Sequence, residues 1–221
     1  MASFTQPINR EADLKAILED YEGRIEDQYW LAHALQKDGI QNSWDARENK
    51  NGKEWSCTLF CTDSENKKYK IVGIVDTGTT GLTGKIPTNQ DEVIEGLKNL
   101  DTNEKLCFFL SSNWSKKAED ALGSRGRGKM IFIGASKDNC IFFDSLRNED
   151  GKYVFGKIYL NKNKAVMEEV YQEAEADNER TNIFGHKFTR LEKSGTRILI
   201  PNANDEVVHA FENFSIEQFI Q

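Results

Sequence analysis

Long apolar runs are the first thing that this sequence lacks. The opening residues, MASFTQPINREADLK, contain no stretch that resembles the apolar core of a signal peptide. No later segment approaches the roughly 20 consecutive apolar residues that span a bilayer. We therefore expect a protein that stays in the cytoplasm and does not enter a membrane.

Histidine and cysteine are also scarce, with three and four residues respectively. Cys57 and Cys61 follow a C-x3-C spacing inside an apolar, strand-like run, whereas Cys107 and Cys140 stand apart. A zinc site would need a second close pair of cysteines or a histidine at ligand spacing, and the sequence offers neither. The cysteines are therefore expected to be reduced, buried thiols.

An excess of basic residues is missing as well, because 29 Lys and Arg face 36 Asp and Glu, a formal net charge of -7. A surface that binds nucleic-acid phosphates needs positive charge, so we expect no direct nucleic-acid binding by this chain. What the sequence does contain is enough mass for a core, since 38% of its 221 residues are hydrophobic. Trp30 and Trp44 are expected to belong to that core.

The periodicity of the apolar residues predicts an α+β protein. The expected helices, in chain order, are 9–23, 27–47, a weak one at 92–99, one that begins at 128, 164–179 and a helical tail from 202. The expected strands are 54–62 and 69–76, a hairpin of 140–147 with 153–160, and a second hairpin within 186–201. This order implies a two-layer α/β sandwich, with a mixed, mostly antiparallel sheet and helices on one of its faces.

A long segment separates the strand that ends at Asp76 from the hairpin at 140–160. Up to the helix that begins at 128 it is poorly periodic, carries several glycines and contains only the weak helix and the short apolar run LCFFL. Insertions of this length in a compact domain are typically lids or binding loops. Residues 82–122 are therefore predicted to form a lid.

The helix predicted at 27–47 ends in polar residues that share one face. Asp38, Asn42 and Asp45 stand at positions i, i+4 and i+7, and Leu31 continues the same stripe toward the N-terminus. A face that starts apolar and becomes acidic and amide-bearing is typical of the floor of a cleft. A helix end that simply meets water would show the same pattern, and this stretch alone does not choose between the two.

Two glycine-containing motifs add to this helix. Asp76 and Gly78 belong to a DTG sequence at the end of a β-branched strand, where a carboxylate is held rigidly, and Gly81 follows them. The sequence GSRGRGK at 123–129 runs into an apolar helix, so backbone N–H groups and the positive helix end are aimed at an anion.

In this order, the motifs resemble those of the GHKL ATPases, the family of gyrase, heat-shock chaperones, histidine kinases and MutL, including prokaryotic relatives of the MORC type. QNSWDA is similar to the family's E-x-x-x-N-x-x-D-A helix, DTG to its D-x-G, and GSRGRGK to its G-x-x-G-x-G. Ser194-Gly195-Thr196 resembles the family's late Gly-Thr element. The resemblance covers 25–201 and implies a Bergerat-type ATP-binding fold with a long ATP lid.

The resemblance implies a role for each matching residue. Asn42 would ligate Mg²⁺, Asp76 would accept the amino group of adenine, and Thr196 would sit beside it through water. Asp38 would take the place of the glutamate that activates the attacking water. The other residues implied in ATP binding are Asp45, Gly78 and Gly81, and in the phosphate-binding loop Gly123, Arg125, Gly126, Arg127, Gly128 and Lys129.

Two departures from the family pattern have consequences. Asp38 is one carbon shorter than the family's glutamate, which leaves the rate of hydrolysis open. Thr80 stands where the family's D-x-G-x-G has its second glycine, and Gly81 follows one residue later, which leaves the shape of this loop open.

Two other families share short motifs with this chain. GSRGRGK has the G-x4-G-K spacing of a P-loop, but Met130 follows it where the loop's Mg²⁺-binding hydroxyl should stand. IVDTGTTGLTG looks like the active-site strand of pepsin-like aspartic proteases, which need two such carboxylates. The candidates for the second carboxylate, Asp63 and Asp144, lack the glycine, so a protease would have to be a dimer of one-motif chains.

We therefore predict an N-terminal arm at 1–24, a GHKL-type ATP-binding domain at 25–201 and the start of a linker or following domain at 202–221. The chain is expected to be a fragment of a longer protein in which ATP closes the lid and drives homodimerisation. By analogy with the MORC-like relatives, its role would be related to DNA or to defence. The alternatives are a nucleotide sensor that does not hydrolyse, a kinase-type catalytic domain and, less favoured, the aspartic protease.

Overall fold

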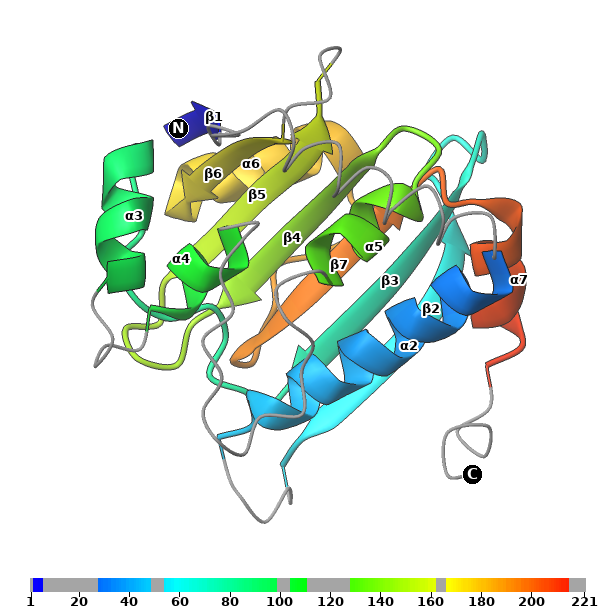
Figure 1. Ribbon diagram of the computed structural model, residues 1–221, viewed down its shortest axis with the longest axis horizontal. Helices are drawn as coiled ribbons and strands as arrows, with labels where there is room; N and C mark the ends of the chain where they lie inside the picture. Colours follow the sequence, from blue (N-terminus) through cyan, green and yellow to red (C-terminus); the bar gives the residue numbers. More distant parts are fainter. Residues whose placement is uncertain are drawn as a thin grey trace.

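A computed structural model describes residues 2–5, 28–48, 54–98, 104–110, 128–161 and 166–214. Its centre is a seven-stranded sheet in the order β1-β6-β5-β4-β7-β3-β2 (Figure 1), and each neighbouring pair is antiparallel. The strands are β1 (Ala2–Thr5), β2 (Ser56–Asp63), β3 (Lys70–Thr77), β4 (Cys140–Leu146), β5 (Tyr153–Leu160), β6 (Val166–Gln172) and β7 (Gly195–Pro201).

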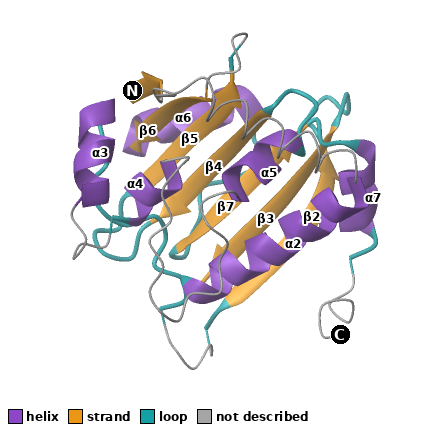
Figure 2. Cartoon of the chain, viewed as in Figure 1, coloured by secondary structure: helices purple, strands orange, loops and turns teal. Residues whose placement is uncertain are grey.

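Helices cover both faces of this sheet (Figure 2). They are α2 (Gln28–Asp45), α3 (Gln90–Lys98), α4 (Lys105–Leu110), α5 (Gly128–Gly134), α6 (Glu173–Phe184) and α7 (Asp205–Glu212). The helices α2, α4, α5 and α7 share one hydrophobic core with the sheet, whereas α6 packs on the opposite face. Among the residues described, no helix has both the length and the hydropathy of a membrane span.

The strands contribute to two cores because successive side chains of a strand point to opposite faces. In β4, Phe143 packs on the side of α2, whereas Phe142 makes an edge contact with Phe184 of α6 at 5.0 Å between ring centroids. Val72 and Ile71 of β3 divide in the same way between the two cores. Burial on both faces explains why β3 and β4 read as nearly continuous apolar runs.

Much of the predicted arrangement is confirmed. The fold is α+β with an antiparallel sheet, and α2, β2, β3, α5 and the β4–β5 hairpin lie close to the ranges that periodicity indicated. The expected placement of helices on one face holds for α2, α4, α5 and α7, and α6 adds a layer on the other face.

Two predictions in the second half of the chain are wrong. The helix expected at 164–179 is divided, because Val166–Gln172 forms strand β6 and α6 begins only at Glu173. β6 pairs along its length with β5, and this pairing overrides the helix preference of its glutamates. The hairpin expected within 186–201 does not form, because β7 is the one strand of this fully described stretch and inserts between β4 and β3.

The segment predicted as a lid is partly folded. Its described residues, 82–98 and 104–110, form α3 and α4, and they bury Val93, Leu106 and Leu110 in the core. The rest of the predicted lid lies outside the described residues, as does the helix expected at 9–23. The helical tail is confirmed as α7, which ends at Glu212.

Candidate functional site

Three polar side chains lie in a row at one end of the sheet. They are Asp76 on β3, Thr196 on β7 and Ser145 on β4, and strand alternation puts all three on the face that α2 and α5 cover. Ser145 is the sheet partner of Thr196, and their hydroxyl oxygens are 3.3 Å apart. The backbone N–H of Thr196 donates to Asp76 Oδ1 at 2.9 Å. The register of three neighbouring strands therefore builds this row.

Asp76 is the charged member of the row, and it is buried, with 8% of its surface exposed. The Thr79 hydroxyl donates to its Oδ1 atom at 2.6 Å. Burial raises the pKa of Asp76, while the donors Thr79, Thr196 and Ser43 and the charge of Lys105 act in the opposite direction. A buried carboxylate surrounded by donors is a rigid acceptor for an N–H group of a ligand.

Helix α2 approaches this carboxylate through two small residues. A Cβ on Gly39 would come within 2.3 Å of Ile74 Cδ1, so a larger residue would displace that side chain. Ser43, one turn later, is buried and lies over Asp76, which follows Ile74 by two residues on the same face of β3. The end of the helix is tied to the loop after β3, because the N–H of Thr80 donates to the Ala46 carbonyl at 3.0 Å.

The three polar α2 residues singled out in the sequence border this buried stripe. Asp38 is half-buried, whereas Asn42 and Asp45 are exposed. Asn42 immediately precedes Ser43, so its amide lies at the end of the sheet that carries Asp76 and is accessible from solvent. The structure thus brings the α2 motif and the DTG motif to the same end of the sheet.

Lys105 is a site residue that sequence reasoning missed. It begins α4, and its Nζ atom donates to the Thr80 hydroxyl in the loop that follows Asp76. Burial lowers the pKa of Lys105, although the charges of Asp76 and Glu48 act to raise it. No motif surrounds Lys105, so the sequence carried no signal for it.

Ser43 and Ser145 were missed as well, although a signal existed for the first. Ser43 lies inside QNSWDA, one helical turn after Gly39 and two after Leu35, so helix periodicity aligns it with the buried stripe. The place of Ser145 in the site depends on the register between β4 and β7, and no pattern in the sequence predicts that these two strands pair.

Two tryptophans flank the end of α2. Trp55, just before β2, donates its indole N–H to Ser43 Oγ at 2.8 Å. Trp44 packs edge-on against Trp55, with ring centroids 5.0 Å apart, and the Arg47 guanidinium lies 3.9 Å from the Trp44 ring centroid. Trp44 is 38% exposed, so its predicted place in the core is wrong: it faces outward on α2, away from the sheet.

The glycines that follow Asp76 have a packing role. Gly78 and Gly81 both adopt positive φ, at 71° and 67°. A Cβ on Gly78 would meet the Glu54 carbonyl oxygen at 2.2 Å, and one on Gly81 would meet that of Leu146 at 2.5 Å. The protein's own backbone therefore fills the space that the sequence suggested for a ligand.

The loop predicted to bind phosphates is described only at its end. Gly123, Arg125, Gly126 and Arg127 lie outside the described residues. Gly128 and Lys129 open α5, which packs against α2 on the same face of the sheet (Figure 1). The two helices that carry the predicted metal and phosphate ligands are therefore neighbours.

A Mg²⁺ site of the expected kind fits the residues at the end of α2. No cluster of three or more His, Cys, Asp or Glu capable of holding a metal occurs in the part of the chain that the structure describes. Mg²⁺ bound to a nucleotide needs no such cluster, because phosphates and water supply most of its ligands. The exposed Asn42 amide can supply one oxygen, and Asp38 stands one helical turn away.

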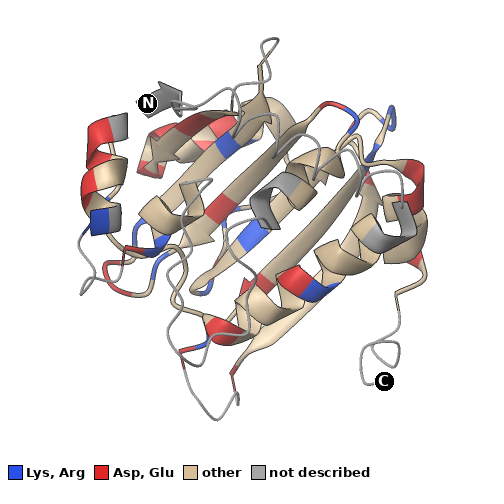
Figure 3. Cartoon of the chain, viewed as in Figure 1, with Lys and Arg blue, Asp and Glu red and all other residues tan. Residues whose placement is uncertain are grey.

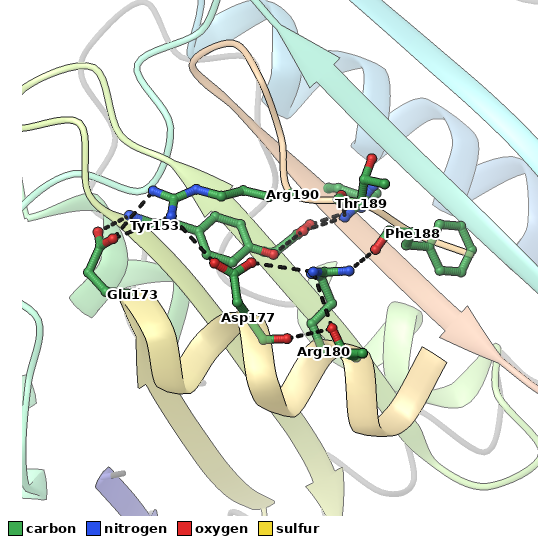
Figure 4. A network of polar contacts seen from close by, with 10 residues as sticks. Tyr153, Glu173, Asp177, Arg180, Phe188, Thr189 and Arg190 are labelled. Atoms are coloured by element: carbon green, nitrogen blue, oxygen red, sulfur yellow. Dashed lines mark hydrogen bonds and ion pairs between the residues drawn. The ribbon is translucent and has the colours of Figure 1, made fainter. Parts of the chain in front are cut away.

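A second polar cluster lies on the opposite face of the sheet, between the sheet and the acid-rich helix α6 (Figures 3 and 4). Its centre is Asp144, whose Oδ1 accepts from Arg197 Nε at 3.0 Å and whose Oδ2 accepts from the Tyr153 hydroxyl at 2.7 Å. Asp144 therefore cannot share a proton with Asp76. Asp63, the other candidate, lies at the far end of β2. Neither of the two candidate residues can therefore form an aspartic-protease pair with Asp76.

No protein-family model matches the chain, and no curated protein sequence matches it. The ATPase and transducer domains of DNA topoisomerase II from Balamuthia mandrillaris are similar at a TM-score of 0.44 and 13% identity, over 85% of this chain and 39% of that one. The ATPase region of Saccharomyces cerevisiae topoisomerase II bound to ICRF-187 gives 0.46 and 10%, over 81% and 42%.

The chain spans about two fifths of the length of the topoisomerase chains to which it is similar. At TM-scores of 0.44 and 0.46 these likenesses carry no argument about function, which rests on the residues themselves.

Proposed function

We propose that this chain is an ATP-binding domain of GHKL type, in which Asp76 selects the adenine base. The observation that carries the proposal is the buried Asp76 carboxylate at the end of β3, held by Thr79 and by the Thr196 N–H. A carboxylate accepts hydrogen bonds from an exocyclic amino group, which adenine offers. Guanine presents a carbonyl oxygen at the matching position, which a carboxylate repels.

The neighbouring residues supply the remaining parts of the site. Asn42 would hold the Mg²⁺ that accompanies ATP, and the ion would neutralise charge on the phosphates. Asp38, one turn before Asn42, would accept the proton of the attacking water. Gly128 and Lys129, at the start of α5, would lie against the phosphates together with the loop from Gly123 to Arg127.

The proposal includes slow ATP hydrolysis and homodimerisation that depends on bound ATP. Asp38 is shorter than the glutamate of related sites, so water activation is expected to be weak, and a pure nucleotide sensor is the second candidate. We further propose that ATP binding closes the 82–122 segment and promotes homodimerisation of the longer protein. A role related to DNA or defence is carried only by analogy with MORC-like relatives.

Thermal unfolding in the presence of nucleotides tests the proposal. ATP with Mg²⁺ should raise the melting temperature by mass action, and GTP at the same concentration should do so much less. Equal shifts with both nucleotides would contradict a role for Asp76 in base selection. Peptide cleavage that pepstatin inhibits would instead favour a protease assembled from two chains.

A further inference from the structure

The indole of Trp55 determines how the Ser43 hydroxyl can be used. Trp55 Nε1 lies 2.8 Å from Ser43 Oγ, and Ser43 is 2% exposed, so water does not compete for this contact. An indole N–H can only donate, whereas a serine hydroxyl has one proton and two lone pairs. Because Ser43 accepts from Trp55, its single proton remains for an acceptor on its other side.

Gly39 lies against Ile74 of β3, so Ser43, one helical turn after Gly39, lies over Asp76, two residues after Ile74 on the same face, and near its partner Cys57. Cys57 and Asp76 are direct partners across the β2–β3 pair, so they lie side by side under α2. Burial raises the pKa of Cys57 to about 11, so the sulfur stays protonated at neutral pH and is a weak acceptor. Of the two, the carboxylate is the stronger acceptor for the Ser43 proton.

We propose that Trp55 is a positioning residue of the base-selecting site: its indole N–H holds Ser43 so that the serine hydroxyl donates to Asp76. This inference rests on the proposed function of Asp76 as the base acceptor. A carboxylate has about four acceptor positions. Thr79 and Thr196 occupy two of them, and the Ser43 hydroxyl would take a third, which leaves one position for one N–H of a bound ligand.

Two elements supply the charged and titratable groups beside Asp76: β2 with Cys57 and α4 with Lys105. Glu48, in the loop after α2, acts on Lys105. On α2 the group that faces Asp76 is the Ser43 hydroxyl, which does not titrate in this range. Of these groups, the Ser43 hydroxyl is the one that Trp55 orients.

The first test uses the unaltered chain without nucleotide. The indole ¹H–¹⁵N resonance of Trp55 should shift with pH at the midpoint at which the ¹³C-labelled carboxyl of Asp76 titrates, because protonation of Asp76 weakens the Ser43 bond. The Trp44 indole, which makes only ring contacts with Trp55, serves as the internal control. A Trp55 resonance that stays constant through the Asp76 titration would overturn the proposal.

The second test compares ATP with purine riboside triphosphate, which lacks the exocyclic amino group. Trp55→Phe keeps an aromatic ring but removes the donor, so the preference for ATP should fall roughly five-fold, the scale of one hydrogen bond. Trp44→Phe should leave the preference unchanged. In a Ser43→Ala background, Trp55→Phe should have no further effect, since its influence passes through Ser43.

The two tests distinguish a failure of the Trp55 role from a failure of the proposed ATP binding. If the wild-type chain binds neither nucleotide, ATP binding is wrong, and the resonance measurement still decides whether Trp55 orients Ser43. If ATP binds with the expected preference and Trp55→Phe keeps that preference intact, the positioning role is wrong while the function stands. Full additivity of Trp55→Phe and Ser43→Ala would likewise overturn the role.

Discussion

The backbone of Gly195 lies directly against the carbonyl of Asp76, so close that a Cβ on Gly195 would be 2.2 Å from that oxygen. This contact allows β7 to begin beside the end of β3 and brings the Thr196 N–H to the Asp76 carboxylate. Two residues 119 positions apart in the chain therefore build one acceptor.

Gly195→Ala should damage this acceptor, because the added methyl group has to displace backbone. We expect a loss of about 1–3 kcal/mol in unfolding free energy, the usual cost of overpacking. Urea unfolding measures it. Gly151→Asn is the matched control, since no atom lies within 4 Å of a Cβ there and asparagine tolerates its positive φ. Equal stability of Gly195→Ala and the control would contradict the contact.

The Arg197–Asp144 pair on the opposite face should be essential for stability. Arg197→Met leaves a fully buried carboxylate without its cation, which costs about 3–5 kcal/mol. Arg190→Met is the control, because that guanidinium is 36% exposed and its contacts to Glu173 and Asp177 are 3.4 and 3.5 Å long (Figure 4). It should cost less than about 1 kcal/mol. Similar losses for both variants in urea unfolding would contradict the assignment.

Asp76 should reduce the stability of the nucleotide-free protein at neutral pH. Its pKa is raised in the folded state, so its favourable contribution is present below the unfolded value of about 3.9 and is lost as the pH rises through the folded value. The unfolding free energy of Asp76→Asn relative to wild type should therefore increase from about pH 4 upward, and it should level off once the pH exceeds the folded pKa. A difference that does not depend on pH would mean that folding leaves the pKa of this carboxyl unchanged.

Asp38 decides between a slow enzyme and a sensor. Asp38→Asn should keep ATP affinity within a few-fold and abolish turnover, because an amide cannot take the proton of water. Asp38→Glu moves the carboxylate by about an ångström, which can change a rate ~100-fold in either direction. Slower turnover in Asp38→Glu indicates a site shaped around aspartate, and faster turnover indicates a degenerate base. Equal single-turnover rates for all three proteins would exclude Asp38 as the base.

The helices and strands that could be predicted from the sequence are those for which one local pattern dominates, such as a β-branched run or helix periodicity. The β-branched run IVGIV predicted β3, and helix periodicity predicted α2, so the positions of Asp76 and Asn42 on these elements could be foreseen. β6 was mistaken for helix because its glutamates favour helix, and only pairing with β5 makes it a strand.

The site residues that could not be predicted from the sequence depend on contacts between segments that are distant in the chain. Ser145 reaches Thr196 through the β4–β7 register, and Lys105 reaches Thr80 through the packing of α4. Trp55 reaches Ser43 across the gap between α2 and β2. None of these pairs has a spacing in the sequence that marks it, so motif reading found the acceptor but not the groups that hold it.

Titration calorimetry of ATP with Mg²⁺ measures whether Asp76 binds the amino group of adenine. Wild type should bind ATP and discriminate against GTP, and Asp76→Ala should lose about 1–3 kcal/mol of ATP binding. Thermal unfolding should show that the variant is folded. If Asp76→Ala binds ATP as tightly as the wild type, Asp76 is not the base acceptor and the account of this site is wrong.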